Sequence, residues 1–134
     1  MQTILFLCTA NSCRSQMAEG FARQLAYGRY RIFSAGTEPK EIHPLAVRVM
    51  REAGIDISKQ SSKGLDRVPL DAIDQVVTLC DAADERCPAL GAGVKRIHWP
   101  FPDPAAALGS EEELLPRFRQ VRDEIQKRVQ TLIS

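Results

Sequence analysis

The chain has 134 residues, of which 44% are hydrophobic and 26% are charged, and its formal net charge is +1. This length suits one domain, residues 1–134, and the ordinary composition indicates a soluble globular protein. So small a net charge gives no support for a nucleic-acid or membrane-surface partner. The apolar run 4–7 is too short for a signal-peptide core or a membrane span. We therefore expect a cytoplasmic protein.

The predicted elements alternate between buried strands and amphipathic helices. In chain order they are a strand at 3–7, a helix at 17–25, a strand at 30–34, a helix that begins at Pro44 and ends before Gly54, strands at 76–79 and 94–99, and a C-terminal helix. This alternation predicts an α/β fold with three layers, in which helices cover both faces of a four-stranded parallel sheet.

The start of the C-terminal helix is ambiguous in the sequence. Its apolar residues step by three or four from Phe118 to Leu132. Ser110 and Glu113 resemble a capping box, but Pro116 would then lie beyond the first turn, where proline is favoured. Either a short turn precedes the main helix, or Pro116 starts it.

Four cysteines stand at positions 8, 13, 80 and 87. In a reducing compartment they indicate catalysis or metal binding more than a structural disulfide framework. Their spacings, C-x4-C and C-x6-C, are not typical of zinc sites, and the chain has only two histidines, so we expect no metal. Cys8 and Cys80 each follow a predicted strand, and Asp103 follows the last one. The carboxyl ends of parallel strands share one edge of the sheet, where functional groups gather.

The segment Cys8-Thr9-Ala10-Asn11-Ser12-Cys13-Arg14-Ser15 runs from strand through loop to helix. Such a loop directs backbone N–H groups into a concavity, and the helix N-terminus adds partial positive charge, so residues 9–14 are expected to bind an oxyanion. Arg14 can hold two oxyanion oxygens with its planar guanidinium. The same positive field favours the thiolate form of Cys8, which makes it the candidate nucleophile, and Ser15 can donate a hydrogen bond to its sulfur.

The sequence CTANSCRSQMAE resembles the loop of the low-molecular-weight tyrosine phosphatase family, and specifically of its arsenate reductase branch, which is coupled to thioredoxin. Further similar blocks are SAGTEP (34–39), HPLAVRVMREAGIDIS (43–58), VVTLCDAADERCP (76–88), HWPFPDPA (98–105) and FRQVRDEI (118–125). The resemblance implies a nucleophilic Cys8, an oxyanion-binding Arg14 and a general acid at Asp103. A solvated turn is the alternative role for Asp103.

Three features favour the reductase branch over the phosphatases. Gln16 stands where the phosphatases have proline, and Ala105 stands where they tend to carry an aromatic residue that stacks on phosphotyrosine. The block VTLCDAADERCP also supplies Cys80 and Cys87. Simple packing of these two cysteines near a strand end is the alternative. Hydrolysis of phosphate monoesters by a tyrosine phosphatase, and a non-catalytic thiol switch or metal sensor, remain the other hypotheses.

The resemblance implies a relay of three cysteines that reduces arsenate to arsenite for arsenic detoxification. Cys8 attacks arsenic, Cys80 then forms a Cys8–Cys80 disulfide, and Cys87 moves it to Cys80–Cys87 by thiol–disulfide exchange. Seven residues span roughly 10 Å along a helix, against about 6 Å between the α-carbons of a disulfide, so we predict local unwinding of 81–86. Cys13 is expected to pack without redox chemistry, and neither histidine is needed chemically.

No bound cofactor is expected. Thioredoxin is the expected reductant, with glutaredoxin or a low-molecular-weight thiol as alternatives, and phosphate or sulfate should compete with arsenate. We expect a monomer, and weak phosphatase activity.

Some reductases of this branch bind potassium, at positions that match Asn11, Glu19, Ser34 and Ser61 here. An acidic ligand of that site is replaced by Lys63, whose ammonium can pair with Glu19, so we expect no potassium dependence.

Overall fold

Four parallel strands form one sheet in the computed structural model, which describes residues 1–133. The strand order is β2-β1-β3-β4. The strands are β1 (Gln2–Cys8), β2 (Tyr30–Gly36), β3 (Gln75–Thr78) and β4 (Lys95–His98). The central strand β1 is buried from Thr3 to Cys8, as its continuous apolar run predicts, because strands lie on both sides of it and other elements cover its two faces.

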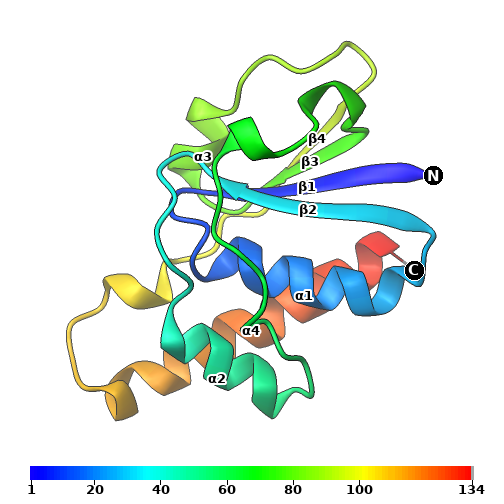
Figure 1. The fold of residues 1–134 in the computed structure, drawn as a ribbon. Coiled ribbons are helices and arrows are strands. Elements are labelled where there is room, and N and C mark those ends of the chain that lie inside the picture. The colour runs from blue at the N-terminus through cyan, green and yellow to red at the C-terminus, as the bar shows by residue number, and fades with distance from the viewer. Residues whose placement is uncertain (134) are drawn as a thin grey trace.

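The helices are α1 (Arg14–Ala26), α2 (Pro44–Glu52), α3 (Asp81–Arg86) and α4 (Glu111–Ile133), with short 3₁₀ turns at Leu65–Arg67, Leu70–Ala72 and Pro104–Ala106. Figure 1 shows α1, α2 and α4 on one side of the sheet and α3 on the other, at the carboxyl ends of the strands. The predicted α/β class, with a parallel sheet and helices on both faces, is confirmed. No helix within 1–133 is both long enough and apolar enough to cross a membrane.

Both predicted starts of the C-terminal helix are wrong. Helix α4 runs without a break from Glu111, and Pro116 lies inside it. A capping box forms at its start, where the Glu113 backbone N–H donates to Ser110 Oγ at 3.3 Å and Ser110 Oγ donates to Glu113 Oε1 at 3.2 Å. Pro116 has no backbone N–H, so the carbonyl four residues before it lacks its helical hydrogen bond. Because Pro116 is exposed, water can donate a hydrogen bond to that carbonyl instead.

The parallel arrangement brings distant segments to one edge of the sheet. Strand β1 pairs with β3 from Ile4↔Gln75 to Leu7↔Thr78, so the residues that follow the two strands emerge together. The loop after Cys8 and the start of α3 therefore become neighbours. These loops gather at the end of the sheet opposite the N-terminus in Figure 1.

Candidate active site

The loop between Cys8 and Arg14 is held by a buried amide network. Asn11 has a positive φ of 50° and is fully buried; asparagine tolerates this left-handed conformation better than most residues. Its Nδ2 donates to Ser15 Oγ at 2.7 Å and to Ser34 Oγ at 3.0 Å. Gln16 Nε2 donates to Asn11 Oδ1 at 2.9 Å. The side chain of Asn11 therefore supports the loop from behind and does not face the cavity described below.

Gln16 anchors the same loop to a distant segment. Its Nε2 also donates to the Ser61 carbonyl at 3.0 Å, and Gln60 Nε2 donates to Gln16 Oε1 at 2.8 Å. A proline, which the phosphatases carry at this position, could make none of these side-chain hydrogen bonds. Gln16 therefore gives this chain its own way of fixing the first turn of α1.

Cys8 lies at the end of β1 with only 2% of its surface exposed. Its Sγ is 2.8 Å from Ser15 Oγ. Because the Asn11 amide can only donate to that oxygen, the Ser15 hydroxyl proton is free to point at the sulfur. A hydrogen bond from Ser15 stabilises the thiolate form of Cys8, which is the form that attacks.

A small cavity of about 140 Å³ lies in front of this loop. Its lining includes the predicted oxyanion-binding residues of the loop except Asn11, whose side chain is held behind the loop. Two further lining residues, Glu38 and Lys40, were not predicted from the sequence. The lining residues are Cys8, Thr9, Ala10, Ser12, Cys13, Arg14, Glu38, Lys40 and Asp103. The ammonium of Lys40 adds positive charge to the rim, which suits an anionic ligand.

Arg14 is buried, with 8% of its surface exposed, and its guanidinium is fixed from one side. Its Nη1 donates to the Phe101 carbonyl at 3.0 Å. Its Nε is buried and has no hydrogen-bond acceptor within residues 1–133, so this N–H is available to a tetrahedral oxyanion in the cavity.

Asp103 lies over the cavity at the start of the turn 104–106. Its Oδ1 accepts a hydrogen bond from the Ala105 N–H at 3.0 Å, and its Oδ2 is 3.9 Å from Arg14 Nη2. Its side chain is 44% exposed, so it can exchange protons with solvent. This placement suits a general acid that protonates a leaving oxygen.

Cys80 is buried beside the loop although 71 residues separate it from Thr9. Thr9 Oγ1 lies 3.3 Å from Cys80 Sγ, and the Ala83 backbone N–H donates to the same sulfur at 3.4 Å. Cys80 also caps the N-terminus of α3. The Cys80 sulfur therefore contacts the first residue of the loop that follows Cys8.

Cys87 lies at the other end of α3, is half-buried, and is not disulfide-bonded. Burial raises the pKa of its thiol, and the charge of Arg96 partly opposes this effect. The helix keeps Cys87 away from Cys80, since seven residues of helix span roughly 10 Å. In this conformation Cys87 is protonated and out of reach.

Cys13 lines the cavity wall at the start of α1, and only 3% of its surface is exposed. Burial raises the pKa of its thiol to about 12, and the Ser12 hydroxyl opposes this effect only partly. Cys13 therefore stays a neutral thiol at physiological pH, and only the thiolate form attacks.

Lys63 lies behind the loop next to Glu19. Its Nζ is 3.6 Å from Glu19 Oε1 and donates to the Ser61 carbonyl at 3.1 Å. Ser34 also donates to Glu19 Oε1. The ammonium thus shares a small polar region with the residues that match the potassium site of related proteins. Within residues 1–133, no three His, Cys, Asp or Glu side chains group closely enough to hold a metal ion.

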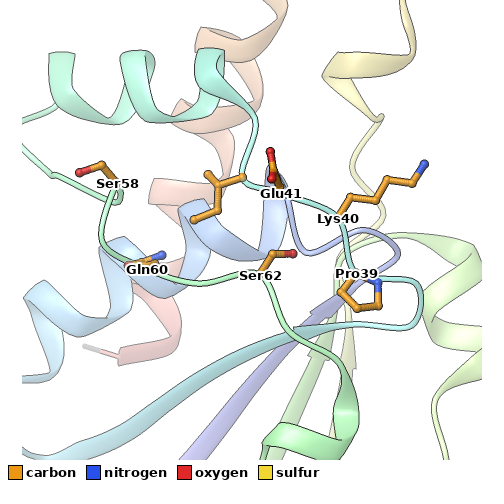
Figure 2. A pocket seen from close by; sticks show the side chains of 7 residues that line it. Pro39, Lys40, Glu41, Ser58, Gln60 and Ser62 are labelled. Carbon is orange, nitrogen blue, oxygen red and sulfur yellow. The ribbon is translucent and has the colours of Figure 1, made fainter.

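A wider groove of about 550 Å³ adjoins the cavity, with Lys40 lining both. Figure 2 shows Pro39, Lys40 and Glu41 on one side of it, and Ser58, Gln60 and Ser62 on the other. No cysteine lines this groove. The smaller cavity at Cys8 is therefore the candidate active site.

Comparison with known proteins agrees with this geometry. The family described as low molecular weight phosphotyrosine protein phosphatase matches residues 3–134, and the chain belongs to that family. Among its relatives, an arsenate reductase of Bacillus subtilis is 52% identical over 126 residues, which cover 94% of this chain and 91% of the relative. An arsenate reductase of Halalkalibacterium halodurans is 49% identical over 130 residues, 97% of this chain and 94% of the relative.

A solved structure described as an arsenate reductase in the phosphate binding state matches with a TM-score of 0.80 and 36% identity, covering 99% of this chain and 97% of the other. The predicted resemblance to the arsenate reductase branch of this family is thereby confirmed.

Proposed function

We propose that this chain reduces arsenate to arsenite by a relay of Cys8, Cys80 and Cys87, and that thioredoxin or another small thiol reductant recycles it. The observation that carries the proposal is the position of Cys80, whose sulfur contacts Thr9 of the oxyanion loop at 3.3 Å. A hydrolytic phosphatase has no need of a second cysteine beside its oxyanion loop. The names of the relatives support arsenate as the substrate.

In the first step the Cys8 thiolate attacks arsenic while Arg14 and the loop N–H groups hold the oxyanion. Asp103 gives its proton to the departing oxygen, which leaves as water, and a bond joins Cys8 Sγ to arsenic(V). Cys80 then attacks Cys8 Sγ. The sulfur–arsenic bond breaks, its electron pair passes to arsenic, and arsenite leaves a Cys8–Cys80 disulfide.

In the last step the Cys87 thiolate attacks Cys80 Sγ and expels Cys8 as a thiolate, which leaves a Cys80–Cys87 disulfide. Helix α3 must unwind for this step, because the α-carbons of a disulfide lie about 6 Å apart. Unwinding also exposes Cys87, so its thiolate becomes available only at this stage. The external reductant supplies two electrons that restore both thiols.

The test is arsenate-dependent oxidation of NADPH in the presence of thioredoxin and its reductase. We expect Cys80→Ser and Cys87→Ser to abolish steady-state reduction of arsenate but to retain hydrolysis of a phenyl phosphate ester, since Cys8, Arg14 and Asp103 remain. Wild-type protein that hydrolyses the ester but never oxidises NADPH with arsenate would instead favour a phosphatase. Glutaredoxin with glutathione, in parallel reactions, identifies the reductant.

A further inference from the structure

Helix α3 is held in place by polar contacts and by little apolar packing. Of its six residues only Ala83 is buried. Unwinding α3 therefore exposes little apolar surface, and the polar contacts decide how easily it opens. Three of these contacts pair a basic with an acidic side chain: His98 with Asp81 at 2.9 Å, Arg96 with Asp84 at 3.6 Å, and Arg86 with Glu38 at 2.9 Å.

His98, at the end of β4, contacts α3 directly and also through Thr78. Its Nε2 is 2.9 Å from Asp81 Oδ1, and its Nδ1 is 2.8 Å from Thr78 Oγ1. Thr78 Oγ1 is in turn 3.1 Å from Asp84 Oδ1. The ring thus connects the end of the sheet to the first turn of α3.

We infer that His98 is a positioning residue that holds α3 in its helical form and thereby opposes formation of the Cys80–Cys87 disulfide until the relay reaches it. This inference rests on the proposed function. When the disulfide forms, Cys87 Sγ bonds to Cys80 Sγ, the Cys8–Cys80 bond breaks, and Cys8 leaves as a thiolate. The contacts of His98 belong to the helical form and are lost as α3 unwinds.

The contacts of His98 reach both carboxylates at the start of α3. Because a carboxylate only accepts, Nε2 donates to Asp81. Thr78 Oγ1 lies between Nδ1 and Asp84 Oδ1, so it connects the ring to the second carboxylate. The charged groups around the ring are Asp81 and Asp84 from α3 and Arg96 from its own strand. His98 therefore holds α3 directly at Asp81 and through Thr78 at Asp84.

The experiment measures the equilibrium between the Cys80–Cys87 dithiol and disulfide in dithiothreitol redox buffers. It uses a Cys8→Ser background, in which Cys13 is buried and unreactive. We expect His98→Ala to raise the equilibrium constant for disulfide formation about threefold, as suits a partly exposed pair. Asp81→Ala should also raise the equilibrium constant about threefold, because it removes the acceptor of the same hydrogen bond. The double variant should add little, since both substitutions remove one contact.

Glu85→Ala is the matched control, because it removes one negative charge from α3 outside this network; it should leave the constant unchanged. An unchanged or lower constant in His98→Ala, or full additivity with Asp81→Ala, would overturn the inference. The assay contains no arsenate, so its outcome is independent of whether the chain reduces arsenate. Thermal unfolding of each variant excludes a general loss of structure.

Discussion

Ser15 Oγ lies 2.8 Å from Cys8 Sγ, and it accepts the Asn11 amide, so its own proton is left for the sulfur. The nucleophile is thus fixed by a chain of directed hydrogen bonds, from Gln16 through Asn11 and Ser15 to Cys8. Each link is buried, which excludes competing water.

Replacing Ser15 with alanine should slow the attack of Cys8 without weakening oxyanion binding. A hydrogen bond to a charged group contributes about 1.5–3 kcal/mol, so kcat for arsenate should fall roughly 10- to 100-fold. Inhibition by phosphate, which measures binding to Arg14 and the loop, should change little. The rate of Cys8 alkylation by iodoacetamide at pH 6 should fall in parallel. Equal alkylation rates in the two proteins would contradict a role for Ser15 in stabilising the thiolate.

Gly36 is required where β2 passes behind the oxyanion loop. A β-carbon at this position would lie 2.6 Å from the Thr9 carbonyl oxygen and 2.9 Å from the Asn11 nitrogen, and neither backbone atom can move without distorting the loop. We expect Gly36→Ala to lower kcat/KM more than tenfold and to reduce the melting temperature. Gly91→Ala is the control, since a β-carbon there meets nothing within 4 Å. A Gly36→Ala protein with wild-type activity would show that the loop tolerates displacement.

Local spacing made the oxyanion loop predictable from the sequence, because Cys8 and Arg14 lie within one strand–loop–helix segment. The carboxyl ends of parallel strands share one edge of the sheet. The sequence therefore also indicated that Asp103 and Cys80, which follow predicted strands, would lie close to the loop. Side-chain partners far apart in the chain could not be foreseen: Gln16 meets Gln60 across 44 residues, and Arg86 meets Glu38 across 48.

The sequence missed three further features for physical reasons. Glu38 and Lys40 line the cavity because the chain turns after β2. In the sequence, Glu38 belongs to the block SAGTEP, which indicates only a family resemblance. The contacts of His98 with Asp81 and Thr78 depend on where α3 packs, which the sequence does not show. Pro116 argued against a helix start at Ser110, but its exposed position makes one lost hydrogen bond tolerable.

The stability of the protein should depend on Cys13 at high pH. The unfolded thiol ionises near pH 8.5, whereas burial holds the folded pKa at about 12. Between these values the unfolded state has lost a proton that the folded state keeps, so the free energy of unfolding falls as the pH rises. The free energy of unfolding, measured with urea, should decrease less between pH 8 and pH 10.5 for Cys13→Ala than for wild type. An equal decrease in the free energy of unfolding of both proteins would mean that Cys13 ionises freely in the folded protein.

Potassium should have no effect on the reaction, because the Lys63 ammonium lies 3.6 Å from Glu19 and supplies positive charge there. We expect the same kcat/KM when sodium is exchanged for potassium at constant ionic strength. Lys63→Gln removes this charge and should lower the melting temperature. A marked rise in wild-type kcat/KM with potassium would contradict the proposal that Lys63 takes the place of the cation.

The relay itself is tested most directly by a single turnover of the Cys87→Ser protein. Reduced protein is mixed with one equivalent of arsenate, and arsenite is measured while the disulfides are mapped by mass spectrometry. We predict one equivalent of arsenite and a Cys8–Cys80 disulfide that persists, because the third thiolate is absent. No arsenite, or a disulfide that joins Cys8 to Cys13, would contradict the relay.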